Sequence, residues 1–513
     1  MHPDFPLFAL ALPLVPLLIG LLHRAAAARH EPALVRLGQA AGLTTALLAV
    51  FVTWNTGPAQ LTLWAPAGAA WLHLALRLDL LSVTMAVLVA FLGAVVSGFS
   101  LHYLAGDPRR GKFLGWIQFT LAAVLTLVLA GSLGLILLAW VATSLVLHRL
   151  LLYFPQRTGA VFSARKKFVV SRLGDLSLLA AIILLYHHYG TTELPALFAR
   201  AGAGDTAPLP LAAGFLVVCA ALKSAQFPFH SWLPDTMETP TPVSALMHAG
   251  IINAGGFLII RLSPLMVHAP AALQVLAIIG AVTAAFGAIV MLTQPSVKRA
   301  LAYSTIAQMG FMLLQCGVGA FGLALLHIVA HSLYKAHAFL RAGSTIGAVP
   351  RAAVPLPTGA VLGGLLGAAL LTAGGATALH LLAPSHARVP ALFTLVVGLA
   401  LAYGLSRTWS SGGGLAAALG GAAAMVGLAV ASFALHGLAQ VLSAGFPVHQ
   451  PPTGLIVGLA LAFLGLFLAQ SLIWRAHHSP WGRRLHVHVL NGFYIGTLAN
   501  RLLNRLWPRS IQS

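Results

Sequence analysis

The chain has 513 residues, of which 59% are hydrophobic and 7% charged, and its mean hydropathy is +0.91. Soluble proteins carry roughly a quarter charged residues, so this composition excludes a water-soluble enzyme. It is also too apolar for a disordered chain. It fits a polytopic membrane protein, in which each spanning helix needs about 20 apolar residues.

Lys and Arg total 29 against 9 Asp and Glu, which gives a formal net charge of +20. All nine acidic residues precede position 239. The basic residues sit in short gaps between apolar runs, where they anchor loops to anionic lipid. We therefore expect these charges to bind membrane lipid and not nucleic acid. Cys219 and Cys316 each lie alone in an apolar run and predict neither a disulfide nor a metal site.

Apolar runs bounded by Pro, Gly or charge predict an all-α fold with about fifteen transmembrane helices. The runs fall at 7–22, 37–54, 79–103, 112–130, 132–154, 166–189, 208–226, 242–262, 271–293, 299–317, 320–341, 358–383, 390–406, 414–444 and 453–476. The first run has neither a basic segment before it nor a small-residue cleavage site after it. We therefore expect a retained helix and not a signal peptide.

Lys and Arg gather at alternate boundaries between these runs, as at Lys166 and Lys167, which stand at the start of the run 166–189. The intervening gaps hold only four, among them Arg77 and Arg261. Because positive charge marks cytoplasmic loops, the N-terminus is expected in the periplasm and the C-terminus in the cytoplasm. The tail from Arg483 to Trp507 alternates apolar and basic or amide residues at helical spacing. It predicts an amphipathic helix on the cytoplasmic surface or a docking site for an acidic soluble partner.

Lys223 is the first candidate functional residue, because its apolar run meets Pro228 and Pro234. Each proline removes a backbone donor, so the helix must break. Irregular backbone at membrane depth is tolerated only where protein or a water-filled cavity surrounds it. Desolvation lowers the pKa of a lysine placed there, and a nearby carboxylate raises it. A lysine subject to both effects can take up and release protons. The alternative is a lysine that snorkels from a helix end.

A second candidate segment starts at Glu238 and reaches His248 through two prolines, Pro240 and Pro242. The prolines set a non-helical start, which places His248 one to two turns into the next helix. A neutral imidazole is well matched to proton transfer near neutral pH, although a lone histidine is more often a packed core residue. We take Glu238 and His248 as candidate translocation residues.

His327, His331 and Lys335 are spaced four residues apart in one apolar run. On a helix they share one face over about 12 Å, which is typical of a proton relay bridged by single waters. Inert polar packing is an alternative. So is a two-histidine metal pair, but no third ligand is visible and the lysine would oppose a cation, so no metal is expected.

Asp175 is a carboxylate well inside a helix, with Arg172 three residues earlier on the same face. Two interpretations remain open. The pair is simply neutralised within the helix, or Asp175 is the charge that tunes Lys223.

Together these motifs resemble the antiporter-like membrane subunits of NADH-quinone oxidoreductase, hydrogenase complexes and Mrp antiporters, from about Phe168 to Gly343. The resemblance implies two inverted five-helix repeats, broken helices seven and twelve, and a line of buried ionisable groups at mid-membrane. It assigns the family's key lysine to Lys223 and its broken-helix histidine to His248. It assigns the central relay to His327, His331 and Lys335.

With this resemblance the chain divides into five parts. Helices one to three occupy 1–110, the two repeats 111–262 and 263–410, the last helices 411–476, and the basic tail 477–513. The chain departs from the family where a glutamate is usual in helix five, since the place near Val141 is apolar. It also departs in helix twelve, where Leu371 to His380 offers only hydroxyls and a histidine.

The short tail with Asn491-Gly-Phe-Tyr494 most resembles the DabB branch, the membrane subunits of the DAB inorganic carbon accumulation system. That resemblance implies a bacterial inner-membrane subunit that conducts protons or Na+ and a soluble DabA-type partner at the cytoplasmic face. The zinc is expected in the partner, where CO2 is hydrated, and this chain is expected to hold neither a cofactor nor a catalytic site. The alternatives are a proton-pumping subunit of an NADH-quinone oxidoreductase-like complex and a structural membrane anchor.

Overall fold

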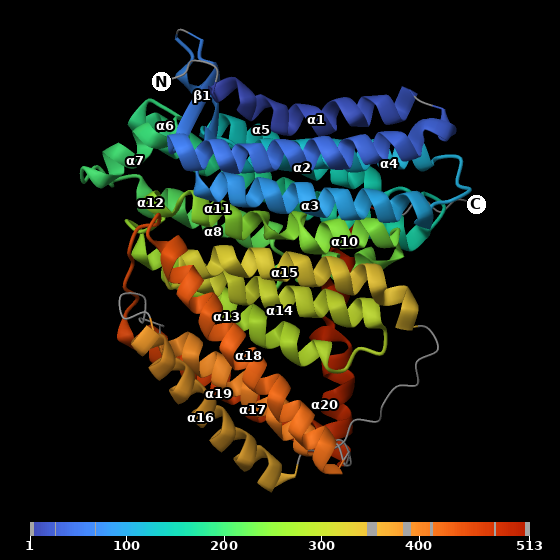
Figure 1. Ribbon diagram of the computed structural model, residues 1–513, viewed down its shortest axis with the longest axis vertical. Coiled ribbons are helices and arrows are strands. Elements are labelled where there is room, and N and C mark those ends of the chain that lie inside the picture. Colours follow the sequence, from blue (N-terminus) through green and yellow to red (C-terminus); the bar gives the residue numbers. More distant parts are fainter. Residues whose placement is uncertain are drawn as a thin grey trace.

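The chain folds into a bundle of long helices that lie side by side, as the computed structural model in Figure 1 shows. It describes residues 5–25, 27–66, 68–345, 357–382, 391–410, 414–476 and 479–507. Within these residues thirteen helical segments are long and apolar enough to cross a membrane. They are α1 (Phe5–Ala25), α2 (Glu31–Thr56), α3 (Leu80–Tyr103), α4 (Arg110–Val128), α5 (Leu133–Leu151), α6 (Thr158–Tyr189), the pair α10 (Thr241–Ala249) and α11 (Ala254–Arg261), α13 (Pro270–Met291), α15 (Phe321–Arg341), α16 (Thr358–Leu382), α17 (Ala391–Trp409), α18 (Gly414–Ser443) and α19 (Thr453–Ala476).

Two further helices, α8 (Leu209–Lys223) and α14 (Val297–Gly317), lie in the same bundle, but α8 is shorter and α14 carries more polar residues. Each of the fifteen predicted runs therefore coincides with a helix or a helix pair, which confirms the helical fold. That all fifteen cross the membrane stays a prediction. Shorter elements connect them: η1 (Ala28–His30), η2 (Ala70–Leu72), α7 (Leu194–Gly202), η3 (Phe229–Ser231), α9 (Trp232–Asp235), η4 (Thr236–Glu238), η5 (Ile251–Asn253), α12 (Ser263–Met266) and η6 (Ala342–Thr345).

A small β-hairpin between α2 and α3 is an element that the sequence analysis missed. Strand β1 (Ala59–Trp64) pairs antiparallel with β2 (Leu74–Leu78) at one end of the bundle (Figure 1). Strand β2 has three buried residues, Ala75, Leu76 and Leu78, whereas β1 has none. The hairpin covers the ends of the neighbouring helices without adding a domain.

The helix that contains Lys223 is broken, as predicted. Helix α8 ends at that lysine, and the short helical turns η3, α9 and η4 carry the chain to Thr241. The next span is also interrupted, since α10 ends at Ala249 and η5 separates it from α11. The prolines at 228, 234 and 240 account for the first break because each removes a donor from the helical ladder.

The break expected in helix twelve is absent, so that expectation from the resemblance was wrong. Helix α16 runs without interruption from Thr358 to Leu382. Its sequence contains no proline, so every residue keeps the backbone donor that a continuous helix requires.

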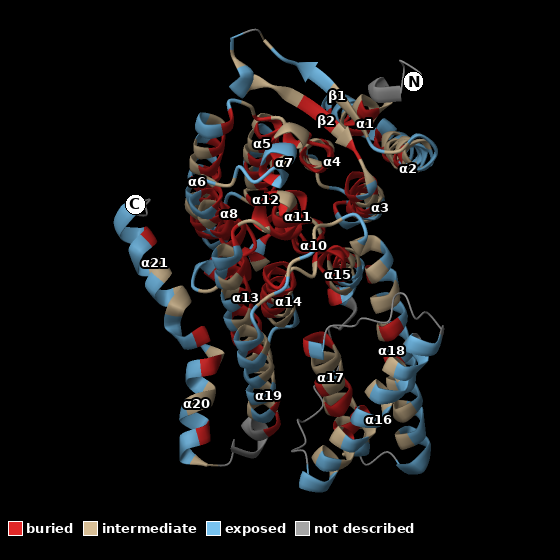
Figure 2. Ribbon diagram, turned by 90° about the vertical axis from the view of Figure 1, so that its left-hand side faces the viewer, coloured by how far each residue is buried: buried red, intermediate tan, exposed pale blue. Residues whose placement is uncertain are grey.

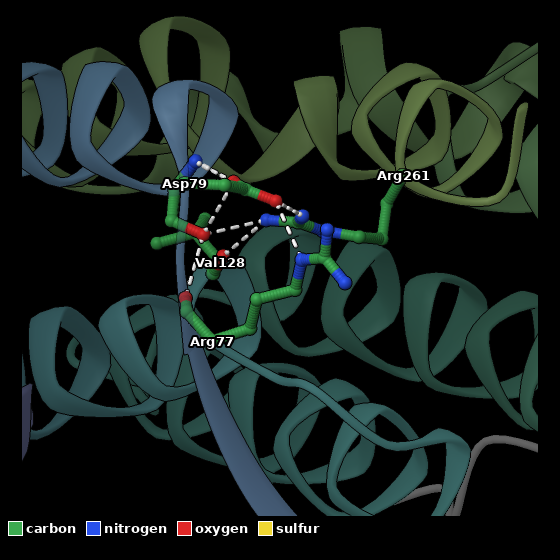
Figure 3. A network of polar contacts seen from close by, with 5 residues as sticks. Arg77, Asp79, Val128 and Arg261 are labelled. Atoms are coloured by element: carbon green, nitrogen blue, oxygen red, sulfur yellow. Dashed lines mark hydrogen bonds and ion pairs between the residues drawn. The ribbon is translucent and has the colours of Figure 1, made fainter. Parts of the chain in front are cut away.

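Arg261, the last residue of α11, forms the most extensive buried polar network at one end of the bundle (Figure 3). Its guanidinium lies 2.5 Å from Asp79 and donates to the Ser82 hydroxyl at 2.7 Å and to the Val128 carbonyl at 3.1 Å. Arg77 on β2 contacts the same carboxylate at 2.8 Å. The sequence analysis treated Arg261 as a loop charge. The structure shows that it is buried and ties α11 to β2, α3 and α4.

Asp79 has a second role as the N-cap of α3, since it accepts a hydrogen bond from the Ser82 backbone N–H at 2.9 Å. Burial alone would raise the pKa of this carboxyl. Arg261, the Ser82 N–H and Arg77 together nevertheless hold the pKa of Asp79 well below its usual value. Asp79 is therefore a charged anchor at the start of α3.

Helices α13 and α14 pack with their backbones almost in contact, and glycine allows it. A Cβ added at Gly280 would lie 2.5 Å from the Gly310 carbonyl, and one at Gly317 would lie 2.4 Å from the Ala277 backbone nitrogen. Small residues that let helices approach closely are typical of membrane interfaces. This pair fixes the position of α14, which carries several partners of the candidate site.

The C-terminal tail forms two helices, α20 (Pro480–Leu490) and α21 (Ile495–Leu506), joined by η8 (Gly492–Tyr494). Figure 2 shows them running beside α6, α8, α13 and α19, across the direction of the bundle helices. Trp507 contacts the Arg165 guanidinium with 5.1 Å between charge and ring, and Gln294 donates to the Leu490 carbonyl at 3.0 Å. The predicted amphipathic tail helix is confirmed, in two pieces.

Candidate functional site

Lys223 lies at the end of α8 with its side chain turned into the protein. Its Nζ lies 3.4 Å from the Trp140 carbonyl and 3.3 Å from the Thr143 hydroxyl, both on α5. It also sits 4.3 Å from the centre of the Trp140 ring. Only 8% of the residue is exposed. This is a buried amine with weak, neutral acceptors, and not a lysine that snorkels to a surface.

Asp175 pairs with Arg172 on the same helix, with 2.7 Å between the charged atoms. The same guanidinium donates to the Ser144 hydroxyl on α5 at 3.0 Å. The structure therefore shows the neutralised pair that was one of the two interpretations. The pair lies on α6, which packs against α8. Its charges therefore act on Lys223 through space.

The place of the absent glutamate on α5 is taken by hydroxyl groups. Thr143 accepts from Lys223, and Ser144 accepts from Lys167 at 2.9 Å through its hydroxyl and at 3.0 Å through its carbonyl. Lys167 was assigned to a loop by the sequence analysis, as was Lys166. Helix α6 in fact begins at Thr158, so both lysines lie inside it and are buried.

His248 is fully buried on α10, where its Nδ1 lies 3.1 Å from the Thr305 hydroxyl of α14. Its ring stacks on Phe339 of α15 with 4.3 Å between ring centres. Its Nε2 is buried without a hydrogen-bond partner. These contacts enclose the imidazole between α10, α14 and α15.

The predicted ladder on α15 faces α10 and α14. The Nε2 of His331 lies 3.3 Å from the carbonyl of His248, and the rings of His327 and His331 lie 6.0 Å apart. His327 bonds Gln315 at 2.8 Å. Lys335 donates to the Ser304 hydroxyl at 2.7 Å. The spacing of four residues thus does bring these groups to one face, as predicted.

Polar residues at the breaks connect the two clusters. The Ser224 hydroxyl donates to the Ile252 carbonyl at 2.8 Å, and Asn253 donates to the Ser332 hydroxyl of α15 at 2.9 Å. A cavity of about 30 Å³ is lined by Thr143 and Asn253 together with mostly apolar residues of α3, α4 and α11. The sequence analysis did not single out Ser224, Asn253 or Ser332. The position of Ser224 and Asn253 at two helix breaks was the available signal, whereas Ser332 lies inside the continuous helix α15.

Glu238 does not join this line. It is exposed in η4, and its carbonyl accepts a hydrogen bond from Arg157 at 3.1 Å. Asp235 nearby is ion-paired with Lys166. The turns η3, α9 and η4 lie at the end of the bundle before α10 enters it, so Glu238 remains at the surface. A role of Glu238 in translocation stays a prediction.

In the part of the chain that the structure describes, no group of three or more His, Cys, Asp or Glu side chains could hold a metal ion. His327 and His331 are followed by Lys335, and their neighbours are amide, hydroxyl and carbonyl groups. The geometry is that of a line of bases and not of a ligand shell.

A line of buried lysines and histidines beside broken helices, inside a bundle of membrane-length helices, defines the class of antiporter-like membrane subunits. Two family profiles match the chain. The family described as NADH:quinone oxidoreductase/Mrp antiporter, TM matches residues 130–353. The family described as NADH-Ubiquinone oxidoreductase (complex I), chain 5 N-terminus matches residues 64–114.

Similar proteins agree with this class. The probable inorganic carbon transporter subunit DabB2 of Halothiobacillus neapolitanus is 39% identical over 87% of this chain and 83% of its own length. NADH-quinone oxidoreductase subunit L of Mycobacterium tuberculosis is 38% identical over 56% of this chain and 46% of its own length. In the structure of the Mrp complex from Dietzia, one chain superposes with a TM-score of 0.59 at 25% identity, covering 98% of this chain and 58% of that one.

The chain therefore belongs to the family of antiporter-like membrane subunits that includes the DabB proteins and NADH-quinone oxidoreductase subunit L. It spans most of the DabB2 relative and about half of the subunit L relative.

Proposed function

We propose that this chain is the ion-conducting membrane subunit of an energy-coupled inorganic carbon uptake complex. Protons, or alternatively Na+, pass along Lys223, His248, His327, His331 and Lys335. The observation that carries the proposal is the short contact between His331 and the carbonyl of His248, which joins the α10 and α15 parts of one buried line. Similarity to an inorganic carbon transporter subunit supports the uptake role.

The chemistry of the line favours protons. Amine and imidazole groups bind a proton directly, and hydroxyls and single waters carry it between them. Na+ prefers oxygen ligands held as a shell, whereas this line alternates nitrogen bases with isolated hydroxyls. Asp175 supplies a carboxylate on α6 that favours positive charge at Lys223 through space.

The proposed partner is a DabA-type soluble protein that holds zinc and hydrates CO2 at the cytoplasmic face. Ion flow down its gradient through this chain makes the hydration effectively one-way. The proposed location is the bacterial inner membrane, with the N-terminus periplasmic and the C-terminus cytoplasmic. The clustering of Lys and Arg in alternate gaps supports this orientation.

A proton-pumping subunit of a respiratory complex is the second candidate, because subunit L of Mycobacterium tuberculosis is 38% identical over 293 residues. The two functions differ in what accompanies the chain. Purification from the native membrane yields a large zinc-containing soluble protein under the first, and flavin or iron–sulfur subunits with quinone reductase activity under the second.

The substitution Lys223→Ala tests the conducting role. In cells that need the intact complex for growth at low CO2, we expect the variant to abolish growth rescue while the protein remains in the membrane at normal abundance. Rescue equal to that of the unmodified chain would contradict the proposal.

A further inference from the structure

A second buried amine adjoins the line, and neither the prolines nor the spacing that identified the other residues points to it. Lys167 is 3% exposed, which makes it more buried than Lys223. It lies on the tenth residue of α6, about 14 Å along the helix from Thr158. Its Nζ donates to the hydroxyl and the carbonyl of Ser144. None of the described carboxylates lies within ion-pairing distance of it.

The neighbouring lysine is different. Lys166 is ion-paired with Asp235, whose side chain is 31% exposed at the end of the bundle. A carboxylate in contact holds an amine in its charged form. Lys166 is thereby an anchor between α6 and α9, while Lys167 has only neutral acceptors.

The acceptors of Lys167 and Lys223 are consecutive residues. Ser144 receives Lys167, and Thr143 receives Lys223 at 3.3 Å. The charged groups that face Lys167 are Arg172 and Asp175 on its own helix, Lys223 on α8 and, when protonated, His148 on α5. Two ammonium groups in one low-dielectric region repel each other, so a proton arriving at one favours release from the other.

We propose that Lys167 is a second proton-binding residue, which exchanges protons with Lys223 through the hydroxyls of Ser144 and Thr143 on α5. The inference rests on the proposed function, since it assumes that Lys223 carries protons. It gives the line a further step toward the end of the bundle where α6 begins.

The transfer is balanced without a redox change. The Nζ–H bond of Lys167 breaks as its proton passes to a hydroxyl or water oxygen. The Ser144 oxygen releases its own proton to the Thr143 hydroxyl, directly or through a water. The Thr143 oxygen in turn releases a proton, which forms a bond to the neutral Nζ of Lys223. The return step reverses both bonds, so each hydroxyl ends as it began.

Arginine separates this role from a structural one. An Arg at position 167 keeps the positive charge and hydrogen-bond donors, but it cannot release a proton in a protein. A purely structural donor to Ser144 is replaced by Lys167→Arg, whereas a proton-exchanging amine is not. Lys167→Met removes both properties. Lys166→Arg is the matched control, because an arginine keeps an ion pair with Asp235.

The measurement is the initial rate of proton influx into liposomes that contain the full complex, driven by a potassium diffusion potential and followed with a pH-sensitive dye inside. We expect Lys167→Arg and Lys167→Met each to lower the rate at least about tenfold, the scale of a lost acid–base group. Lys166→Arg should keep the rate. Wild-type influx in Lys167→Arg overturns the inference.

Two further variants keep the test decisive. Ser144→Ala removes the shared hydroxyl and should lower the rate, while Ser144→Thr restores a hydroxyl and should recover it. An unchanged rate in Ser144→Ala overturns the pathway even if the Lys167 variants fail to fold. Lys223→Ala distinguishes failure of the proposed function from failure of the role proposed for Lys167. If it retains influx, the proposed function itself fails. If it loses influx while Lys167→Arg does not, only the role of Lys167 fails.

Discussion

The bundle from α1 to α15 and the helices α16 to α19 differ in what they bury. The first region encloses lysines, histidines and an arginine network, each held by named partners. In the described part of α16 to α19, the buried polar residues are two serines, Ser406 and Ser471. No lysine or acidic residue follows position 335 in the whole sequence.

The two regions also differ in packing. The α10–α11 pair is the most buried of the membrane-length segments, whereas α16, α18 and α19 are among the least buried. Leu366, Leu370 and Leu415 are each exposed by 70% or more. Figure 2 shows α16 and α18 set apart from the buried centre. Polar side chains at membrane depth need protein or water around them, and the candidate site residues lie where several helices enclose them.

The largest expected effect is the loss of proton flux when one of the enclosed amines is removed. Lys335→Ala removes an amine enclosed by α14 and α15, so we expect proton influx to fall on the order of 100-fold. Liposomes with the full complex and an internal pH dye measure it. The control is Lys112→Ala on the exposed start of α4. Equal rates for the two variants would refute a conducting role for Lys335.

The next effect is on stability. Arg261→Met removes the buried partner of the half-buried Asp79, and losing one partner of a buried pair costs about 3 kcal/mol. Thermal unfolding in detergent measures the change. Arg77→Met is the matched control, because the Arg77 side chain is 24% exposed against 3% for Arg261. The comparison fails if Arg77→Met destabilises the protein as much.

The same network predicts a pH dependence. The pKa of Asp79 is lower in the folded chain than in the unfolded one, so its contribution is complete above the unfolded value of about 3.9 and is lost as pH falls below that value. Asp79→Asn keeps a good N-cap but removes this dependence. We expect thermal stability to fall less steeply below about pH 4 in the variant than in the unmodified protein. Parallel curves would contradict this.

The sequence predicted the placement of those candidate residues whose signal is local. Two prolines mark the end of α8 at Lys223, and spacing of four residues places His327, His331 and Lys335 on one face. Helical periodicity determines such placements without knowledge of the neighbours. The same reasoning predicted the fifteen helical segments, because each is a long apolar run.

What the sequence did not show depends on contacts between distant residues. Arg261 meets Asp79 across 182 positions, and Asn253 meets Ser332 across 79. Neither the helical periodicity nor the count of basic residues between apolar runs predicts such pairings. Lys167 was misplaced for a related reason: the charge pattern marks it as a loop residue, and only the packing of α6 against α5 shows that it is buried.

Glycine substitutions sharpen the packing contrast. Gly280→Ala places a Cβ 2.5 Å from the Gly310 carbonyl, and overpacking of this kind costs about 1–3 kcal/mol. Gly374→Ala on α16 meets no atom within 4 Å and should stabilise by about 0.5–1 kcal/mol through helix propensity. Thermal unfolding of the two variants against the unmodified chain checks the opposite signs. Destabilisation by both would show that α16 is as closely packed as α13, and stabilisation by both would show that Gly280 is not closely packed.

The smallest expected effect belongs to His380, the one histidine in the segment where the resemblance places a charged group of helix twelve. The side chain is exposed on a continuous helix, away from the enclosed line. His380→Ala should therefore leave proton influx unchanged within about twofold, in contrast to His331→Ala, which removes an enclosed imidazole and should lower influx at least about tenfold. The same liposome assay measures both. Equal losses would mean that the line continues from α15 into α16, and that exposed helices of this region are covered in the assembled complex.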